Sequence, residues 1–84
     1  MANKKLLSFE YNGQTFECDE KACQSYVNTK RITEMEKDPI AAFDALEEIF
    51  AGKDEEYAEM LGGAASELFA LYLAAAEAVG AKNS

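Results

Sequence analysis

Two cysteines and several groups of carboxylates are the side chains of this sequence that could do chemistry. Cys18 and Cys23 are separated by four residues, a spacing that fits neither a zinc site nor a redox pair. The chain has no histidine, which removes the usual general base, the Ser-His and Cys-His nucleophile pairs and a common metal ligand. We therefore expect two buried, reduced thiols, no metal ion and no cofactor.

The carboxylates match no catalytic or calcium-binding pattern. Asp54, Glu55 and Glu56 are typical of a helix N-terminus, and the pair Glu47-Glu48 is typical of a solvated helix face. No alternating Asp/Asn loop with a closing Glu is present. Gly62-Gly63 follows an acidic helix and lacks the lysine of a phosphate-binding loop. The sequence thus predicts a protein that is not an enzyme.

Length and charge predict a small, acidic domain that does not bind nucleic acid or anionic membranes. A chain of 84 residues with 49 % hydrophobic side chains forms one small folded domain, residues 1–84, whose core stabilises it only marginally. The net charge is −8, and residues 43–84 hold two Lys/Arg against nine Asp/Glu. Such a surface repels nucleic acid and anionic membranes. Because Ser8 and Glu10 break the apolar run near the N-terminus, we expect no signal peptide there and a cytoplasmic protein.

The N-terminal elements that must position these groups begin with a β-hairpin at about residues 6–18. LLSFEY and QTFEC flank Asn12-Gly13, the dipeptide favoured in two-residue turns that need positive φ. A two-residue loop pairs Phe9 with Phe16 and sets the register of the other residues. One face of the hairpin then carries Leu7, Phe9, Tyr11, Phe16 and Cys18. Two strands alone are unstable, so we expect helices to cover this apolar face.

Three or four helices are expected after the hairpin, which gives an α+β fold that is mostly α. Their predicted ranges are residues 20–36, 39–51, 54–61 and 64–79. Asp19, Asp38 and Asp54 are the expected N-caps, and Gly52 and Gly80 the expected C-terminal stops. Residues 20–36 have an irregular stripe, which predicts a bend near Asn28 or contact with two surfaces. The expected inward faces are Ile40, Phe43, Leu46, Ile49 and Phe50 in the second range and Tyr57, Met60 and Leu61 in the third.

The last helix is the least charged part of the chain. Its apolar residues cover most of the circumference, whereas a helix that buries one face has a stripe about 100° wide. About 16 residues span roughly 24 Å, too short for a membrane. One interpretation is a central core helix. The favoured alternative is a partly exposed apolar surface for self-association or client binding. Its candidate partner-binding residues are Leu68, Phe69, Leu71, Tyr72 and Leu73.

One stretch resembles a known family. MEKDPIAAFDALEEIFAGKDEEYAEMLGG contains a DP-[IL]-x-x-F-D-A-L-like segment from Asp38 to Leu46, and it lies between an Asn-Gly hairpin and an alanine-rich helix that ends AKNS. In order and size, most of the chain resembles the tail assembly chaperones of long-tailed bacteriophages and prophages.

That resemblance implies a non-enzymatic assembly factor. Proteins of this family coat the aggregation-prone tape measure protein while the tail tube polymerises, and many have a longer product made by ribosomal frameshifting. The expected partner is thus the tape measure protein or another tail component, and self-association is also expected. The alternative function is an acidic phage-encoded regulator or inhibitor that acts by protein binding or DNA mimicry.

Overall fold

The N-terminal hairpin forms as the sequence predicts. The computed structural model describes residues 6–83, in which β1 (Leu6–Tyr11) pairs antiparallel with β2 (Gln14–Asp19). Phe9 lies opposite Phe16, which confirms the predicted register. Asn12 and Gly13 take φ values of 54° and 76°, the positive values that the two-residue turn requires. The predicted inner face is confirmed as well, because Phe9, Phe16 and Cys18 are buried and Leu7 and Tyr11 pack against the core.

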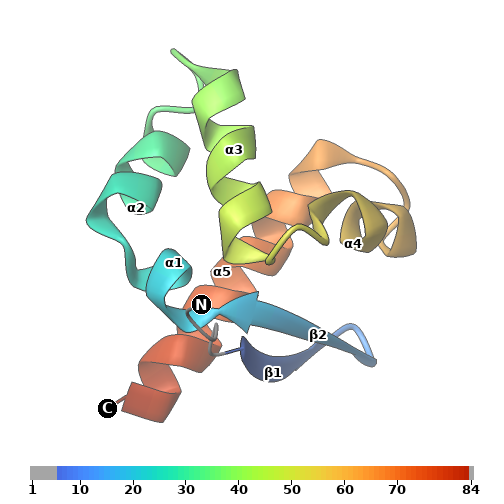
Figure 1. Cartoon of the computed structure of the whole chain (residues 1–84). Coiled ribbons are helices and arrows are strands. Elements are labelled where there is room, and N and C mark those ends of the chain that lie inside the picture. Colours follow the sequence, from blue (N-terminus) through green and yellow to red (C-terminus); the bar gives the residue numbers. More distant parts are fainter. Residues whose placement is uncertain (1–5, 84) are drawn as a thin grey trace.

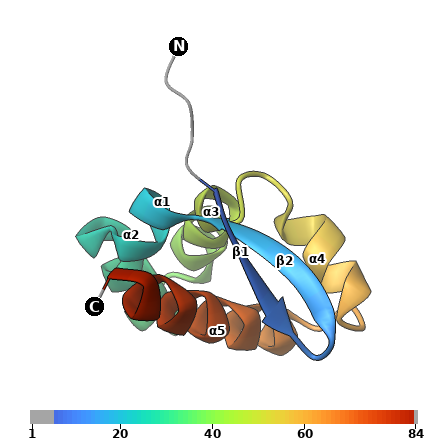
Figure 2. The ribbon, with the colours of Figure 1, turned by 90° about the horizontal axis from the view of Figure 1, so that it is seen from below.

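Five helices follow the hairpin within residues 6–83, so the fold is α+β as predicted, with one helix more than the upper estimate. The long C-terminal helix runs along the hairpin, and the other helices are distributed along its length, so that its last turn lies against the first of them (Figures 1 and 2). The described chain is nearly isotropic, with extents of 31 × 28 × 27 Å. The helices are α1 (Glu20–Gln24), α2 (Tyr26–Thr33), α3 (Pro39–Ile49), α4 (Asp54–Met60) and α5 (Ala65–Asn83).

The predicted helix over residues 20–36 is two helices, and the break lies at Ser25 rather than near Asn28. Asp19 caps α1 as expected, since its side chain accepts a hydrogen bond from the Ala22 N–H at 3.0 Å. Ser25 is extended, and its hydroxyl accepts from the Asn28 N–H to start α2. This break rotates the following residues, so Tyr26 is 77 % exposed and Asn28 is buried.

Asn28 connects α2 to both of its neighbours. Its side-chain nitrogen donates to the Ala22 carbonyl at 3.1 Å and to a carboxylate oxygen of Glu48 on α3 at 3.4 Å. Its side-chain oxygen accepts from Nη1 of Arg31 at 3.2 Å. The buried amide therefore has partners for both of its polar atoms, as a buried polar group requires.

Helices α3 and α4 end in the same type of cap. After α3 the Ala51 N–H donates to Glu48 and the Gly52 N–H donates to Glu47, and after α4 Gly62 and Gly63 make the equivalent bonds. This pattern is the Schellman motif, which requires a left-handed residue after the helix. After α3, the first residue of the cap is Ala51, with a φ of 55°. Gly52, the predicted C-terminal stop, follows it with a φ of 84°.

The starts of α3 and α4 differ. Asp38 caps α3 as predicted, and its side chain accepts from the Ala41 N–H. Asp54 was expected to cap α4, but it is the first residue of the helix, and the N-cap is Lys53 without a side-chain cap bond. A carboxylate in the first turn still interacts favourably with the positive end of the helix dipole.

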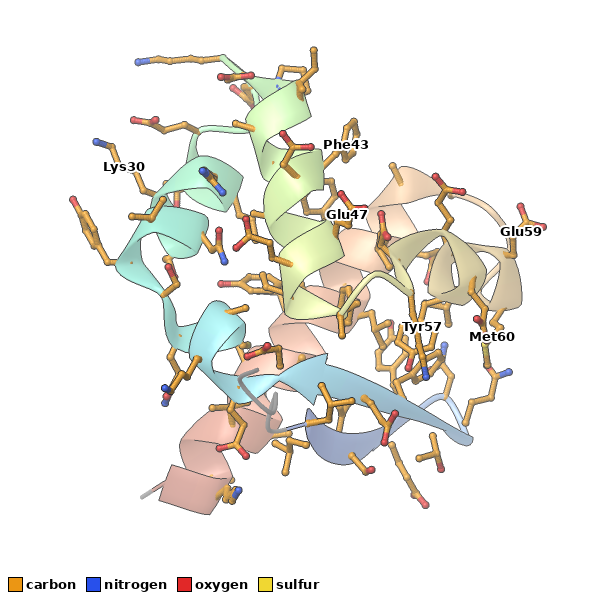
Figure 3. All side chains as sticks on the ribbon, viewed as in Figure 1. Lys30, Phe43, Glu47, Tyr57, Glu59 and Met60 are labelled. Carbon is orange, nitrogen blue, oxygen red and sulfur yellow. The ribbon has the colours of Figure 1, made fainter. Side chains whose placement is uncertain are left out.

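Only part of the expected inward face of α4 is buried. Tyr57 is buried and Leu61 is half-buried, but Met60 is 42 % exposed, so its expected inward position is wrong (Figure 3). The Tyr57 ring packs edge-on against Phe16 at 4.9 Å and Phe50 at 5.7 Å between ring centroids. One aromatic side chain thus holds this short helix on the core.

Helix α5 extends past its predicted end. It runs through Gly80 to Asn83, and Nζ of Lys82 forms an ion pair of 2.6 Å with Oε2 of Glu20 on α1. Val79 is buried one turn earlier. These contacts hold the last turn against α1, which outweighs the low helix propensity of glycine, about 1 kcal/mol relative to alanine.

Candidate functional site

The structure places the five predicted partner-binding residues in three different environments. Leu68, Leu71 and Tyr72 are buried, Phe69 is half-buried, and Leu73 is 64 % exposed. The three buried residues are not available on the surface of the single chain, so the expected partly exposed surface does not include them. They lie on the side of α5 that covers the hairpin and form part of the core of the single chain. Phe69 and Leu73 remain as candidates for contact with a partner.

Helix α3 exposes two large apolar residues that the sequence assigned to its inward face. Ile40 is 72 % exposed and Phe43 is 45 % exposed, so that assignment is wrong for both, while Leu46, Ile49 and Phe50 are buried as predicted. Ile40 and Ile49 are nine positions apart, which at 3.6 residues per turn puts them on opposite sides of the helix. The position of Ile40 on the helical wheel could therefore have predicted from the sequence that its side chain is exposed.

Phe43 is exposed for a different reason. It lies within about 20° of buried Phe50 on the helical wheel, but it is two turns closer to the N-terminus of α3. That end of the helix projects from the body of the molecule (Figure 1). The exposure of Phe43 depends on where α3 extends beyond the core. The periodicity of apolar residues along a single helix does not contain that information.

A ring contact joins the apolar residues of α3 to those of α5. The rings of Phe43 and Phe69 are in contact, with centroids 6.0 Å apart and planes inclined by 38°. Ile40 lies one turn before Phe43 on α3, and Leu73 lies one turn after Phe69 on α5, spacings at which side chains on a helix are neighbours. We call Ile40, Phe43, Phe69 and Leu73 the α3–α5 apolar strip.

Carboxylates flank this strip. Asp44 and Glu47 are exposed on α3, and Glu77 is exposed on α5 one turn beyond Leu73. Figure 3 shows Phe43 and Glu47 projecting from the side of α3 that faces away from α2. None of these three carboxylates forms an ion pair with a residue in the range 6–83. The strip is thus an apolar surface with an uncompensated negative border.

The described cations near the strip have other partners. Arg31 pairs with Glu48 at 3.3 Å, Lys53 pairs with Glu17 at 3.6 Å, and Lys82 pairs with Glu20. Neither α3 nor α4 contains a lysine or arginine, and α5 has only Lys82 at its far end. Lys37, in the turn before α3, is the nearest cation along the chain to Ile40. Within residues 6–83, no lysine or arginine thus forms an ion pair with Asp44, Glu47 or Glu77.

Two carboxylates of the border, Asp44 and Glu47, also line an open depression along α3. Its lining residues are Arg31, Asp44, Glu47, Glu48, Ala51 and Gly52. Glu48 has a structural role there, because one of its carboxylate oxygens accepts a hydrogen bond from Arg31 and the other accepts one from buried Asn28. The predicted solvated pair Glu47-Glu48 is exposed, as expected for such a face.

The two cysteines are free and buried, which confirms the prediction of buried, reduced thiols. Hydrogen bonding between the two thiols raises the pKa of Cys18 above its ordinary value, and burial and the nearby charges of Glu20 and Asp19 raise it further. The same hydrogen bond lowers the pKa of Cys23, while burial opposes that change. The pair thus favours a state in which Cys18 keeps its proton.

The described residues form neither a metal site nor a single membrane-spanning helix. Among residues 6–83, no group of three or more His, Cys, Asp or Glu side chains could hold a metal ion. No single helix in that range meets the length and hydropathy of a membrane span, and α4 and α5 meet them only as a pair bent by 107°. No protein-family model, curated protein or solved structure matches the chain.

Proposed function

We propose that this protein is a non-enzymatic assembly chaperone that binds a partner protein through the α3–α5 apolar strip. The observation that carries the proposal is the contact between Phe43 and Phe69, which joins exposed apolar residues of two helices into one surface. Large apolar side chains gathered in this way mark interaction sites more often than isolated ones do. The protein would act in the bacterial cytoplasm.

The resemblance to phage tail assembly chaperones names the partner class. The DP-[IL]-x-x-F-D-A-L-like segment that carries the resemblance includes Ile40, Phe43 and Asp44, which are two members of the strip and one of its bordering carboxylates. We propose the tape measure protein, or another tail component, as the client. A net charge of −8 would keep a protein with an exposed apolar strip from associating indiscriminately.

Self-association through the same strip is the other proposed way to cover it. A homo-oligomer would hide the strip until a client displaces the second copy. Analytical ultracentrifugation of the purified chain, with and without the client, measures both states.

Co-expression with a long, coiled-coil-rich tape measure protein fragment tests the proposal. The wild-type chain is expected to raise the soluble fraction of the client, and the double variant Ile40→Ser/Leu73→Ser is expected to lose most of that effect. A matched control is Tyr26→Ser/Val27→Ser, which removes two apolar residues that are 77 % and 53 % exposed on α2, outside the strip.

Both double variants change exposed positions, so each should fold, and circular dichroism checks this. If the wild-type chain leaves the client insoluble, the proposed function is wrong. If the two double variants behave alike, the assignment to the strip is wrong.

A further inference from the structure

The negative border of the α3–α5 apolar strip restricts what can bind there. Asp44 and Glu47 on α3 and Glu77 on α5 are exposed and unpaired within residues 6–83. A partner that covers the apolar residues brings its own flanking side chains close to these three carboxylates. Opposite charges at such an edge raise the association rate and favour the right partner, whereas like charges oppose binding.

We propose that the strip binds an amphipathic α-helix whose apolar face is flanked by lysine or arginine. This inference rests on the proposed function and names the chemistry of the partner at the same site. A helix bound on an apolar surface is anchored by its own apolar residues at i, i+3, i+4 and i+7. The cationic flanks of the partner would neutralise Asp44, Glu47 and Glu77.

A second copy of this chain is a poorer occupant of the strip. It would place a second set of Asp44, Glu47 and Glu77 side chains beside the first. In the described part of α3 and α5, only Lys82 is basic, and Glu20 already holds it. An anionic lipid surface is opposed by the same repulsion. The charge of the border thus selects a basic partner over another copy or a membrane.

Two synthetic peptides of 18 residues test this inference. Both carry the same apolar helical stripe, one flanked by lysine and the other by glutamate. Fluorescence anisotropy at low salt is expected to show binding of the lysine peptide about tenfold tighter than the glutamate peptide, a ratio that two or three screened ion pairs supply. In about 0.5 M salt this ratio should shrink toward one, since the Debye length falls below about 5 Å.

Matched variants locate the effect. Asp44→Asn/Glu47→Gln should reduce the preference for the lysine peptide by at least half on a logarithmic scale. Glu55→Gln/Glu56→Gln makes the same change of charge on exposed positions of α4 and should leave the preference unchanged. A scrambled lysine peptide, with equal charge and no apolar stripe, should bind at least tenfold more weakly than the ordered peptide.

The outcomes separate this inference from the proposed function. Equal binding of both peptides, or equal binding of the scrambled peptide, would overturn the basic helix as occupant. A client solubilised by the wild-type chain while neither peptide binds would also overturn it and leave the chaperone function standing. Failure of the peptides and of the client together would remove both proposals.

Discussion

The hydroxyl of Tyr57 accepts a hydrogen bond of 3.1 Å from the backbone N–H of Glu17, forty positions away in the chain. This bond joins α4 to β2, the second strand of a two-stranded sheet. The Tyr57 ring also contacts Phe16 and Phe50, so one side chain both packs in the core and satisfies a backbone donor of the strand. A short helix with one buried residue is thereby fixed to the hairpin.

Tyr57→Phe is expected to lower the free energy of unfolding by about 1–2 kcal/mol, because the Glu17 N–H loses its acceptor while the ring packing stays. In a domain of this size that corresponds to a fall in Tm of roughly 4–16 °C. Urea denaturation followed by circular dichroism measures the change. Tyr26→Phe is the control, since the Tyr26 side chain is exposed and should lose nothing measurable. Equal stability of the two variants would mean that the Glu17 N–H finds water instead.

Local signals in the sequence were sufficient for the hairpin and most helix boundaries. Asn12-Gly13 determines both the turn and the register, and Asp19, Asp38 and Gly52 act within one helical turn of their own positions. The break at Ser25 was missed because it depends on a second cap by a hydroxyl inside an otherwise helical stretch. Such a cap competes with helix continuation through a single hydrogen bond.

Exposure was harder to predict than helix position. Leu71 and Leu73 are both leucines of α5, yet one is fully buried and the other is exposed, because only one side of the helix faces the hairpin. The sequence identified an excess of apolar side chains in this helix. It did not show that α3 would contribute Ile40 and Phe43 to the exposed surface, since that depends on how two helices cross in three dimensions.

Ala51 holds a left-handed conformation that glycine adopts at lower cost. Its φ of 55° lies in the cap after α3, whereas the equivalent position after α4 is Gly62. Ala51→Gly should therefore raise the free energy of unfolding by about 0.5–1 kcal/mol, the left-handed penalty of about 1–2 kcal/mol being partly offset by the greater entropy of glycine in the unfolded chain.

Gly62→Ala provides the reverse comparison, because it places a Cβ at a φ of 106°. Its expected effect is a loss of at least about 1 kcal/mol. Urea midpoints of both variants measure the two changes. A loss of stability in Ala51→Gly would show that the half-buried methyl group of Ala51 contributes more through packing than its backbone conformation costs.

The Cys18 thiol should make the protein less stable in alkaline solution. The pKa of Cys18 is raised in the folded chain from its ordinary value of 9.0, so between these two values the unfolded chain releases a proton that the folded chain retains. The stability that the protonated thiol supplies is complete below pH 9 and is lost as the pH rises toward the folded pKa. Urea denaturation at pH 7, 9 and 10 measures this loss.

Cys18→Ala provides the comparison for this pH series. It is expected to lower stability at every pH, because it empties a fully buried position. It should also flatten the decline above pH 9, because the thiol whose pKa is raised is removed. Parallel pH profiles for the two proteins would contradict the proposed retention of the Cys18 proton. A steeper profile for wild type is the expected result and identifies the Cys18 thiol as the source of the loss.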